Sequence, residues 1–337
     1  MIQAIGGRCA WKADEMRRDT DWVLPLDDGE RTELREAVAR VRSRFAGIEF
    51  GKADFPLKRM AERMAHVRRE VEEGRGVVLM RGLPVDEWDT TSVDQAYWGL
   101  GLHLGTALAQ TPRGDLLVRV EDIADKNPLA RGYRTTEFLP FHNDQGDVVG
   151  LLCVRASKSG GASCIASAAA MHDEILRTRP DLLEVLYGEW FYDVRGEEPP
   201  GRKPYYMEPR FSQVNGRLFT QHGRRYVESA QRFPEVPRLT PQQVEAMDLM
   251  DALCKSEEFR LDMDFRPGDI QFLNNRVVLH SRTDFVDHDD PARKRLLLRL
   301  WLRTPGYAEL PAYFKPRFED MDHWLRHPVT TPAAEPA

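Results

Sequence analysis

Cysteine is scarce in this sequence, and the few cysteines are far apart. The four in 337 residues are Cys9, Cys153, Cys164 and Cys254, and no two of them have C-x-x-C spacing. This pattern excludes a disulfide-stapled secreted scaffold and a cysteine-rich zinc site, and it favours free thiols in a reducing compartment. We therefore expect a cytoplasmic protein.

Long apolar runs and blocks of one charge sign are also missing. The longest apolar run, around 148–154, has the length of a strand, and residues 1–30 lack the apolar stretch of a signal peptide. The 48 basic and 54 acidic residues are mixed along the chain and leave a formal net charge of -6. We expect a small-molecule partner and neither nucleic acid nor membrane; the composition leaves a homo-oligomer open.

The sequence does contain enough apolar material for a folded core, because 42% of its residues are hydrophobic. Helical periodicity predicts helices over residues 30–45, 56–73, 90–105, 168–186 (interrupted at Arg179-Pro180) and 240–258. A period of two predicts short strands over residues 76–82, 116–121, 138–142, 148–155, 163–167, 270–275, 277–282 and 294–303. Residues 192–233 are expected to form a long excursion, and the proline-rich segment after 305 a surface tail.

Helices mixed with many short strands predict an α+β fold with a mainly β core, a jelly roll decorated by helices. We expect a single domain over residues 1–329, with a helical N-terminal portion over about 1–110 and the jelly-roll core over about 75–305. Residues 330–337, rich in proline and alanine, are expected to be a disordered tail.

A metal half-site is indicated by residues 138–147, in which His142 and Asp144 are two residues apart. On an extended segment both side chains project to the same face. A second imidazole comes from His280, at the end of a β-rich run far downstream. Two imidazoles and one carboxylate on rigid strands bind one face of an octahedral metal and leave the other face open for substrates. A lone His-x-Asp pair is commonly only a polar surface pair, so the flanking strands must decide between that interpretation and a metal half-site.

The strand that follows the second histidine carries arginines on one face. In residues 295–303, alternation puts Arg295 and Arg299 on the same face as Leu297 and Trp301, and leucines on the other face. The leucine face packs on a core, so the guanidinium groups point into a partly enclosed space where they need a carboxylate partner. That partner is either an internal Asp or Glu, or a dicarboxylate co-substrate that chelates the metal at one end.

As a set, these residues resemble the TauD/TfdA (taurine dioxygenase) family of Fe(II)/2-oxoglutarate-dependent dioxygenases. The similarity spans roughly residues 70–305, in the family's order. It rests on His142-x-Asp144, on His280 within Asn274-Asn-x-x-x-x-His-x-Arg282, on Arg295 and Arg299, and on the flanking pieces 75–83, 160–163 and 265–270.

The resemblance implies a double-stranded β-helix core that uses Fe(II), with 2-oxoglutarate and O2 as co-substrates. His142, Asp144 and His280 would be the iron ligands. The implied reaction is oxidation, most often hydroxylation, of a C–H bond of a small organic substrate, with decarboxylation of 2-oxoglutarate to succinate and CO2.

The resemblance also assigns the co-substrate pocket. Arg295 would bind the distal carboxylate of 2-oxoglutarate, with Ser163 in the place of a family threonine that helps it, and Arg299 would lie on the same pocket wall. Because the gap between His280 and Arg295 is longer than the commonest family spacing, Arg293 and Arg299 stay alternatives for this contact.

Candidate substrate contacts are Gln110, Tyr133, Arg134 and Asn143, chosen because they flank the metal ligands in sequence. The sequence does not identify the substrate, and it leaves hydroxylation, desaturation, ring closure and removal of a heteroatom group open. Two other classes of protein use a similar core: a metal-binding jelly roll without redox turnover, and a metal-dependent hydrolase or isomerase that does not use 2-oxoglutarate. In the last of these, Arg295 and Arg299 should be unimportant.

Overall fold

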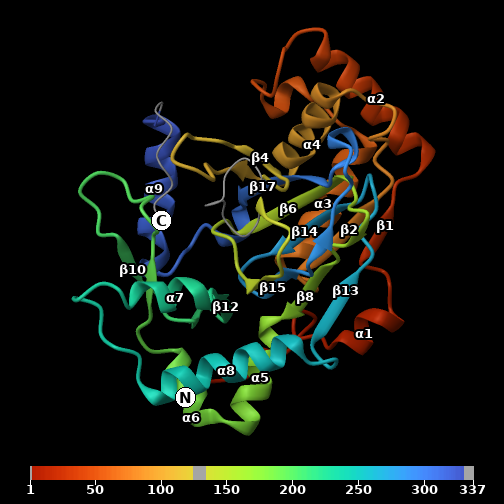
Figure 1. The fold of residues 1–337 in the computed structure, drawn as a ribbon. Coiled ribbons are helices and arrows are strands. Elements are labelled where there is room, and N and C mark those ends of the chain that lie inside the picture. Colours follow the sequence, from red (N-terminus) through yellow and green to blue (C-terminus); the bar gives the residue numbers. More distant parts are fainter. Residues whose placement is uncertain (1, 124–133, 330–337) are drawn as a thin grey trace.

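The computed structural model describes residues 2–123 and 134–329, and it shows helices arranged around central β-sheets (Figure 1). The helices are α1 (Ala13–Arg18), α2 (Asp28–Arg42), α3 (Arg59–Glu72), α4 (Thr90–Leu104), α5 (Ala168–Thr178), α6 (Pro180–Leu186), α7 (Arg224–Ala230), α8 (Pro241–Lys255) and α9 (Lys315–Arg326). Short 3-10 turns are η1 (Lys52–Asp54), η3 (Pro291–Arg293), η4 (Pro305–Tyr307) and η5 (Ala312–Phe314).

The strands are short, and each strand that the period of two predicts is present among them. They are β1 (Val23–Pro25), β2 (Val77–Arg81), β3 (Thr106–Ala107), β4 (Leu117–Val120), β5 (Leu139–His142), β6 (Val148–Arg155), β7 (Ser159–Gly160), β8 (Ser163–Ser167), β9 (Phe191–Asp193), β10 (Tyr205–Met207), β11 (Phe211–Val214), β12 (Arg217–Thr220), β13 (Arg260–Met263), β14 (Ile270–Asn274), β15 (Val278–Arg282), β16 (Phe285–Val286) and β17 (Leu296–Arg303).

Local sequence explains where several helices begin and end. Thr240 caps α8: its hydroxyl accepts a hydrogen bond from the Gln243 N–H, and the Gln243 side chain accepts one from the Thr240 N–H. Pro241 occupies the first turn, as the sequence predicts. The predicted break near Arg179 is confirmed, because α5 ends there and α6 starts at Pro180.

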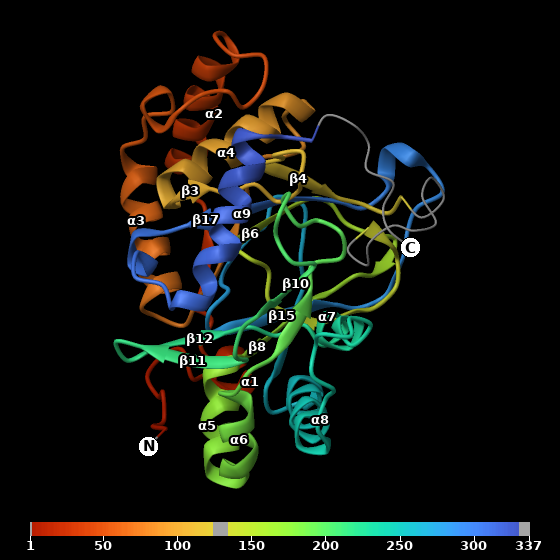
Figure 2. The same cartoon turned by 90° about the vertical axis from the view of Figure 1, so that its left-hand side faces the viewer.

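A seven-stranded sheet forms the larger layer, in the order β1-β2-β14-β6-β17-β3, with β4 also paired to β17. One of its faces packs against α2, α3 and α4, which Figure 2 shows stacked on that side. The leucines of β17 supply part of this contact: Leu298, Leu300 and Leu302 are buried among residues of α2, α3 and α4. A Cβ on Gly101 of α4 would lie 2.6 Å from Leu300 Cδ1, so the glycine allows the helix to approach the sheet closely.

A four-stranded sheet, in the order β13-β8-β15-β5, forms the smaller layer. A second hydrophobic cluster joins the inner face of this sheet to that of the larger sheet. Ile165 of β8, the register partner of His280, shares this cluster with Leu273 of β14 and Leu297 of β17. The confirmed architecture is therefore mixed α+β, with two β layers facing a common interior; the strand pairs in them are antiparallel apart from the parallel pair β1–β2.

The C-terminal segment, expected to be a proline-rich tail on the surface, contains a helix that packs against the core. Residues 315–326 form α9, and Phe318, Met321 and Trp324 on one side of it are buried in the interior cluster. The structure also adds α1, β1, α7 and β13, which the periodicity did not predict. Residues 330–337 lie outside the described residues, so their disorder stays a prediction.

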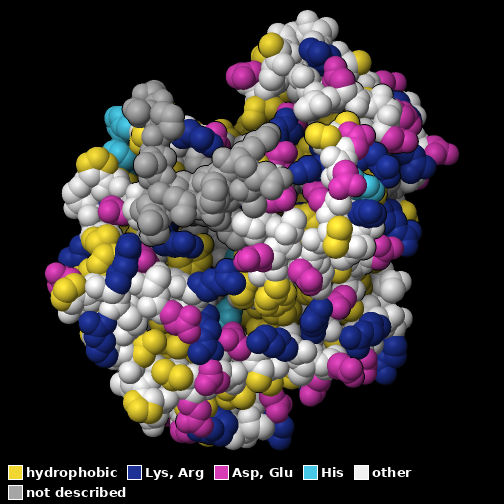
Figure 3. Space-filling view, in the orientation of Figure 1, with side chains coloured by type: hydrophobic (Ala, Val, Ile, Leu, Met, Phe, Trp, Pro, Cys, Tyr) yellow, Lys and Arg dark blue, Asp and Glu magenta, His cyan; other side chains and the backbone are white. Residues whose placement is uncertain are grey.

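Surface features of the described residues agree with the composition. Basic and acidic side chains are interspersed on the face shown in Figure 3, without a dominant patch of one sign. Among the helices that the structure describes, none combines the length and the apolar character that a membrane span needs. All four cysteines are free, and Cys153, Cys164 and Cys254 are buried.

Packing between β17 and the helical layer should dominate stability on this side of the sheet. Leu300 is fully buried, so Leu300→Ala leaves a cavity and should lower the free energy of unfolding by about 3 kcal/mol. Leu325→Ala is the control. Because Leu325 is 47% exposed, this substitution should lower the free energy of unfolding by less than about 0.5 kcal/mol. Urea unfolding measures both, and equal losses would contradict the packing described.

Candidate active site

Antiparallel pairing of β5 with β15 places two histidines side by side. His142 ends β5, and its register partner is His280 in the middle of β15. The two ring centroids are 4.3 Å apart. Directly opposed residues of neighbouring strands have adjacent side chains, so strand pairing alone produces this contact between segments far apart in the sequence.

The turn that follows β5 brings the carboxylate of Asp144 to the histidines. Its backbone N–H donates to Asn275 Oδ1 at 3.3 Å, and Asn143 Nδ2 donates to the carbonyls of Asn275 and Val278. The carbonyl oxygen of the Asn143 side chain accepts from the His222 N–H at 2.8 Å. Asn275 thus ties the turn between β5 and β6 to the turn between β14 and β15, which fixes the carboxylate relative to both strands.

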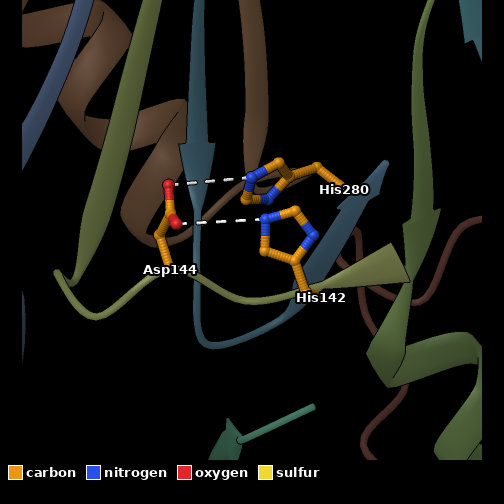
Figure 4. A group of neighbouring side chains, drawn as sticks. All are labelled: His142, Asp144 and His280. Atoms are coloured by element: carbon orange, nitrogen blue, oxygen red, sulfur yellow. Dashed lines mark ion pairs between the residues drawn. The ribbon is translucent and has the colours of Figure 1, made fainter. Parts of the chain in front are cut away.

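Figure 4 shows the three side chains converging, with both imidazole Nε2 atoms facing the carboxylate. The Nε2 atoms of His142 and His280 lie 3.9 and 3.7 Å from the Asp144 carboxylate oxygens, and the potential ligand atoms all lie within 4.8 Å of one another. These separations are too long for hydrogen bonds, as expected for three ligands around one ion. His142 Nδ1 lies 2.8 Å from the Pro140 carbonyl, which favours the tautomer that leaves Nε2 free to bind a metal.

The charge states of the three groups suit a metal site. Burial lowers the pKa of His280 to about 3, assisted by His142, and burial also lowers the pKa of His142. Burial acts to raise the pKa of Asp144, but the positive charge of the Arg299 guanidinium opposes it, and that pKa lies below its ordinary value. Neutral imidazoles and an ionised carboxylate are the forms that bind metals.

Arg299 has an internal carboxylate partner. Its Nη1 lies 3.3 Å from Asp144 Oδ1, and its Nε donates to Gln110 Oε1 at 2.8 Å. Gln110 Nε2 in turn donates to the backbone carbonyls of Arg299 and Leu116, both at 2.9 Å. Gln110 therefore orients Arg299 against His142, Asp144 and His280, which we call the metal group. This is a positioning role.

Arg295, in contrast, has no ion pair within residues 2–123 and 134–329. It is 4% exposed, its Nη1 is buried without a hydrogen-bond partner, and its guanidinium lies over the Phe285 ring at 5.1 Å. Arg282 lies over the same ring at 4.9 Å, and burial, with Arg295 nearby, lowers its pKa to about 10. Arg293 is exposed on η3, so of the three alternative arginines only Arg295 is both buried and unpaired in the part of the chain described.

Ser163 faces the same interior from β8. Its hydroxyl donates to Gln271 Oε1 at 2.9 Å, while Gln271 Nε2 is buried without a partner among the described residues. The sequence analysis did not select Gln271. Alternation along β14 could have placed it on the inward face, but a single buried glutamine carries no functional signature.

A cavity of about 140 Å³ opens beside the metal group. Residues from β5, from the excursion after α6, from β17 and from α9 line it, among them Gln110, His142, Asn143, Asp144, Asp193, Arg195, Glu197, Tyr206, Gln221, Arg224, Arg225, Tyr226, Arg299, Trp301, Arg317 and Trp324.

The four substrate contacts predicted from the sequence differ in whether they line the cavity. Gln110 and Asn143 line it, although the structure also gives both of them hydrogen bonds to backbone groups. Arg134 is not part of its lining, and Tyr133 lies outside the described residues. The sequence analysis missed the lining residues Tyr206, Arg317 and Trp324.

A buried carboxyl group, that of Glu208, interacts electrostatically with Tyr206 and Arg317 of the cavity wall. Neither oxygen of Glu208 has a hydrogen-bond partner in the described part of the chain, and burial raises its pKa to about 8 against the opposing effect of Arg276 and Arg317. Tyr192 and Tyr206 are the other titratable neighbours, and burial raises the pKa of both. Glu208 is therefore protonated at neutral pH.

Comparisons with known proteins agree with this geometry. Residues 42–301 match the family described as taurine catabolism dioxygenase TauD, TfdA. The chain is 32% identical over 320 residues to FR-33289 synthase of Streptomyces rubellomurinus, covering 91% of this chain and 92% of that protein. It is 26% identical over 344 residues to the taurine hydroxylase-like protein SAT17 of Stachybotrys chartarum, covering 96% and 85%.

Solved structures share the fold. Asparagine oxygenase in complex with Fe(II), 2S,3S-3-hydroxyasparagine and succinate superposes with a TM-score of 0.66 at 18% identity, covering 84% of this chain and 94% of that one. The non-heme iron oxygenase OrfP with Fe and alpha-ketoglutaric acid gives 0.63 at 14% identity, covering 83% and 94%.

The fold and the group of two histidines and one carboxylate define an Fe(II)/2-oxoglutarate-dependent oxygenase. Within that class, this chain belongs to the TauD/TfdA family. The resemblance seen in the sequence is thereby confirmed, as are the enzyme class and the use of Fe(II) and 2-oxoglutarate.

Glu208 should make the stability of the protein depend on pH. Its pKa is about 8 in the folded chain and ordinarily about 4.5, so the folded state holds more protons than the unfolded state between these values. The free energy of unfolding should therefore fall by a few kcal/mol as pH rises from 4.5 to 8. Denaturant unfolding from pH 5 to 8.5 measures this loss.

Glu208→Gln is the matched variant for that measurement, since the amide keeps the shape and cannot ionise. It should remove most of the decline seen in the parent. A parallel decline in both proteins would show that Glu208 is not the group responsible.

Proposed function

We propose that the chain hydroxylates a C–H bond of a small polar organic molecule. The observation that carries the proposal is that His142 and Asp144 line the cavity, while a buried arginine without an ion pair among the described residues, Arg295, immediately precedes β17. A pocket with one position for a co-substrate and another for a substrate is what the family's reaction requires.

We assign the metal ligands to His142, Asp144 and His280. The fit rests on three features of the structure: two Nε2 atoms and a carboxylate face one point, the imidazoles favour the neutral state, and His142 Nδ1 is directed to a backbone carbonyl. This donor set is typical of non-heme Fe(II) oxygenases.

We assign the distal carboxylate of 2-oxoglutarate to Arg295, with Ser163 and Gln271 beside it. A buried guanidinium without a carboxylate is costly, so an anionic ligand would satisfy it. When bound, Fe(II) with 2-oxoglutarate and O2 supplies the oxidising chemistry, in which the co-substrate yields succinate and CO2 and a substrate C–H bond is hydroxylated.

The remaining residues position these groups and limit water. Asn275 holds the Asp144 turn, and Gln110 keeps Arg299 against the carboxylate. The interior cluster, which includes Leu151 and Leu297, covers the strands behind the site and keeps that side apolar. The protein therefore contributes fixed ligands, one oriented guanidinium and a partly dry pocket.

We also propose that the two β layers form a double-stranded β-helix within one domain over residues 1–329, and that the protein is cytoplasmic. The likeness to asparagine oxygenase and OrfP supports the first point, and the four free cysteines support the last. Structures of these two proteins contain hydroxylated amino acids, 2S,3S-3-hydroxyasparagine in asparagine oxygenase and (3S)-hydroxy-L-Arg in another OrfP complex, which supports a small polar substrate here. Membership of the family disfavours both the non-redox metal-binding protein and the hydrolase or isomerase.

Iron binding tests the ligand assignment. His142→Ala and His280→Ala should each lower Fe(II) affinity more than about a hundredfold, because each removes a direct ligand. His66→Gln on α3, away from the metal group, is the control and should bind iron as the parent does. Anaerobic titration with Fe(II) gives the affinities, and parent-like binding by either alanine variant would refute the assignment.

Arg295→Lys tests the co-substrate assignment. Lysine keeps the charge but cannot make the two-point contact of a guanidinium, so the dissociation constant of 2-oxoglutarate should rise roughly thirtyfold or more, equivalent to about 2 kcal/mol or more. Fe(II) affinity should stay unchanged. Calorimetry under anaerobic conditions gives both values, and Arg293→Lys serves as the exposed control on the same segment. A larger effect on 2-oxoglutarate in Arg293→Lys would move the contact to that residue.

A further inference from the structure

The C-terminal helix α9 contributes to the wall of the active-site cavity, although it follows the residues that match the family. The match covers residues 42–301, and α9 spans Lys315–Arg326. Two of its residues, Arg317 and Trp324, line the cavity that also contains His142 and Asp144. This part of the pocket therefore belongs to the chain's own C-terminal segment.

Arg317 is buried and only partly satisfied. It is 7% exposed, and its Nη1 lies 3.0 Å from Asp320 Oδ2, one turn along the helix. In the part of the chain that the structure describes, Nε is buried without a hydrogen-bond partner and no hydrogen bond from Nη2 is seen. A buried guanidinium with unused donors on a cavity wall is suited to a ligand that accepts hydrogen bonds.

Aromatic rings hold the guanidinium in place. It lies over Tyr206 at 4.9 Å and over Trp324 at 5.9 Å, and both rings also line the cavity. A side chain fixed in this way loses little conformational freedom when a ligand binds.

The positive charge of Arg317 is not fully compensated. Its partner Asp320 also pairs with Arg202 at 3.2 Å, and Glu208, the other nearby carboxyl, is protonated at neutral pH. Two other arginines of the cavity wall have their own carboxylate partners: Arg224 pairs with Glu228, Asp248 and Asp251, and Arg299 pairs with Asp144.

We propose that Arg317 is a substrate-binding residue that takes an oxyanion group, a carboxylate, sulfonate or phosphate, of the substrate to be hydroxylated. The inference rests on the proposed function, since it assumes that the cavity beside the metal group receives this substrate. Arg299 is held by Asp144 and Gln110, so Arg317 provides a separate anchor on the wall formed by α9. The substrate class is then a small organic anion whose other end reaches the metal group.

The experiment uses the full chain loaded anaerobically with Fe(II) and 2-oxoglutarate, and four probes that share a 2-aminoethyl group: taurine, O-phosphoethanolamine, β-alanine and ethanolamine. Binding is measured by calorimetry and by the fluorescence of tryptophan, because Trp301 and Trp324 line the cavity. At least one of the three oxyanion probes should bind, and ethanolamine, which lacks the anionic group, should not.

Variants of Arg317 give the decisive comparison. Arg317→Gln should lower the affinity for the oxyanion probe at least tenfold, and Arg317→Lys should lower it by less. Both variants should keep parent-like affinity for 2-oxoglutarate, which also shows that they fold. Arg326→Gln is the control on the same helix, because Arg326 is exposed and is not part of the cavity lining; it should bind every probe as the parent does.

Each contrary result has a distinct meaning. If the parent binds 2-oxoglutarate but none of the oxyanions, or if Arg317→Gln lowers stability and leaves oxyanion affinity unchanged, Arg317 is only a helix-stabilising residue and this inference is overturned. If the parent fails to bind Fe(II) and 2-oxoglutarate, the proposed function itself fails.

Discussion

The antiparallel pairing of β5 with β15 is the constraint on which the rest of the site depends. It sets His142 opposite His280, and a register shift of one residue would turn one of the imidazoles to the other face of its strand. Asn275 adds the second constraint, because it links the turn carrying Asp144 to the turn that leads into β15. Residues far apart in the sequence thereby become one rigid group, which is what a metal site with fixed ligands needs.

The arginines of the interior divide the remaining tasks by their partners. Arg299 forms an ion pair with Asp144 and is oriented by Gln110, so its positive charge stabilises the ionised carboxylate of the metal group. Arg295 is buried with no ion pair to any described residue, so its charge awaits a ligand. The sequence placed both on one face of a strand but left open whether their partner was internal or a co-substrate. The structure gives Arg299 an internal partner, Asp144, whereas a co-substrate as the partner of Arg295 stays a proposal.

Much of the site could be predicted because strand alternation and metal chemistry leave visible patterns. The His-x-Asp spacing and the leucine face of β17 follow directly from the period of two, and the capping box of α8 from its residue types. The helix α9 was missed because prolines surround its start and hide the stripe formed by Phe318, Met321 and Trp324. Cavity residues such as Tyr206 come together only through long-range packing, for which local sequence has no signal.

The most direct test of the account is a crystal structure of the protein grown without oxygen in the presence of Fe(II) and 2-oxoglutarate. The account predicts one iron bound by His142, Asp144 and His280, and the distal carboxylate of 2-oxoglutarate in contact with the Arg295 guanidinium. An iron with different protein ligands, or a co-substrate carboxylate held by Arg299 or Arg293, would contradict it.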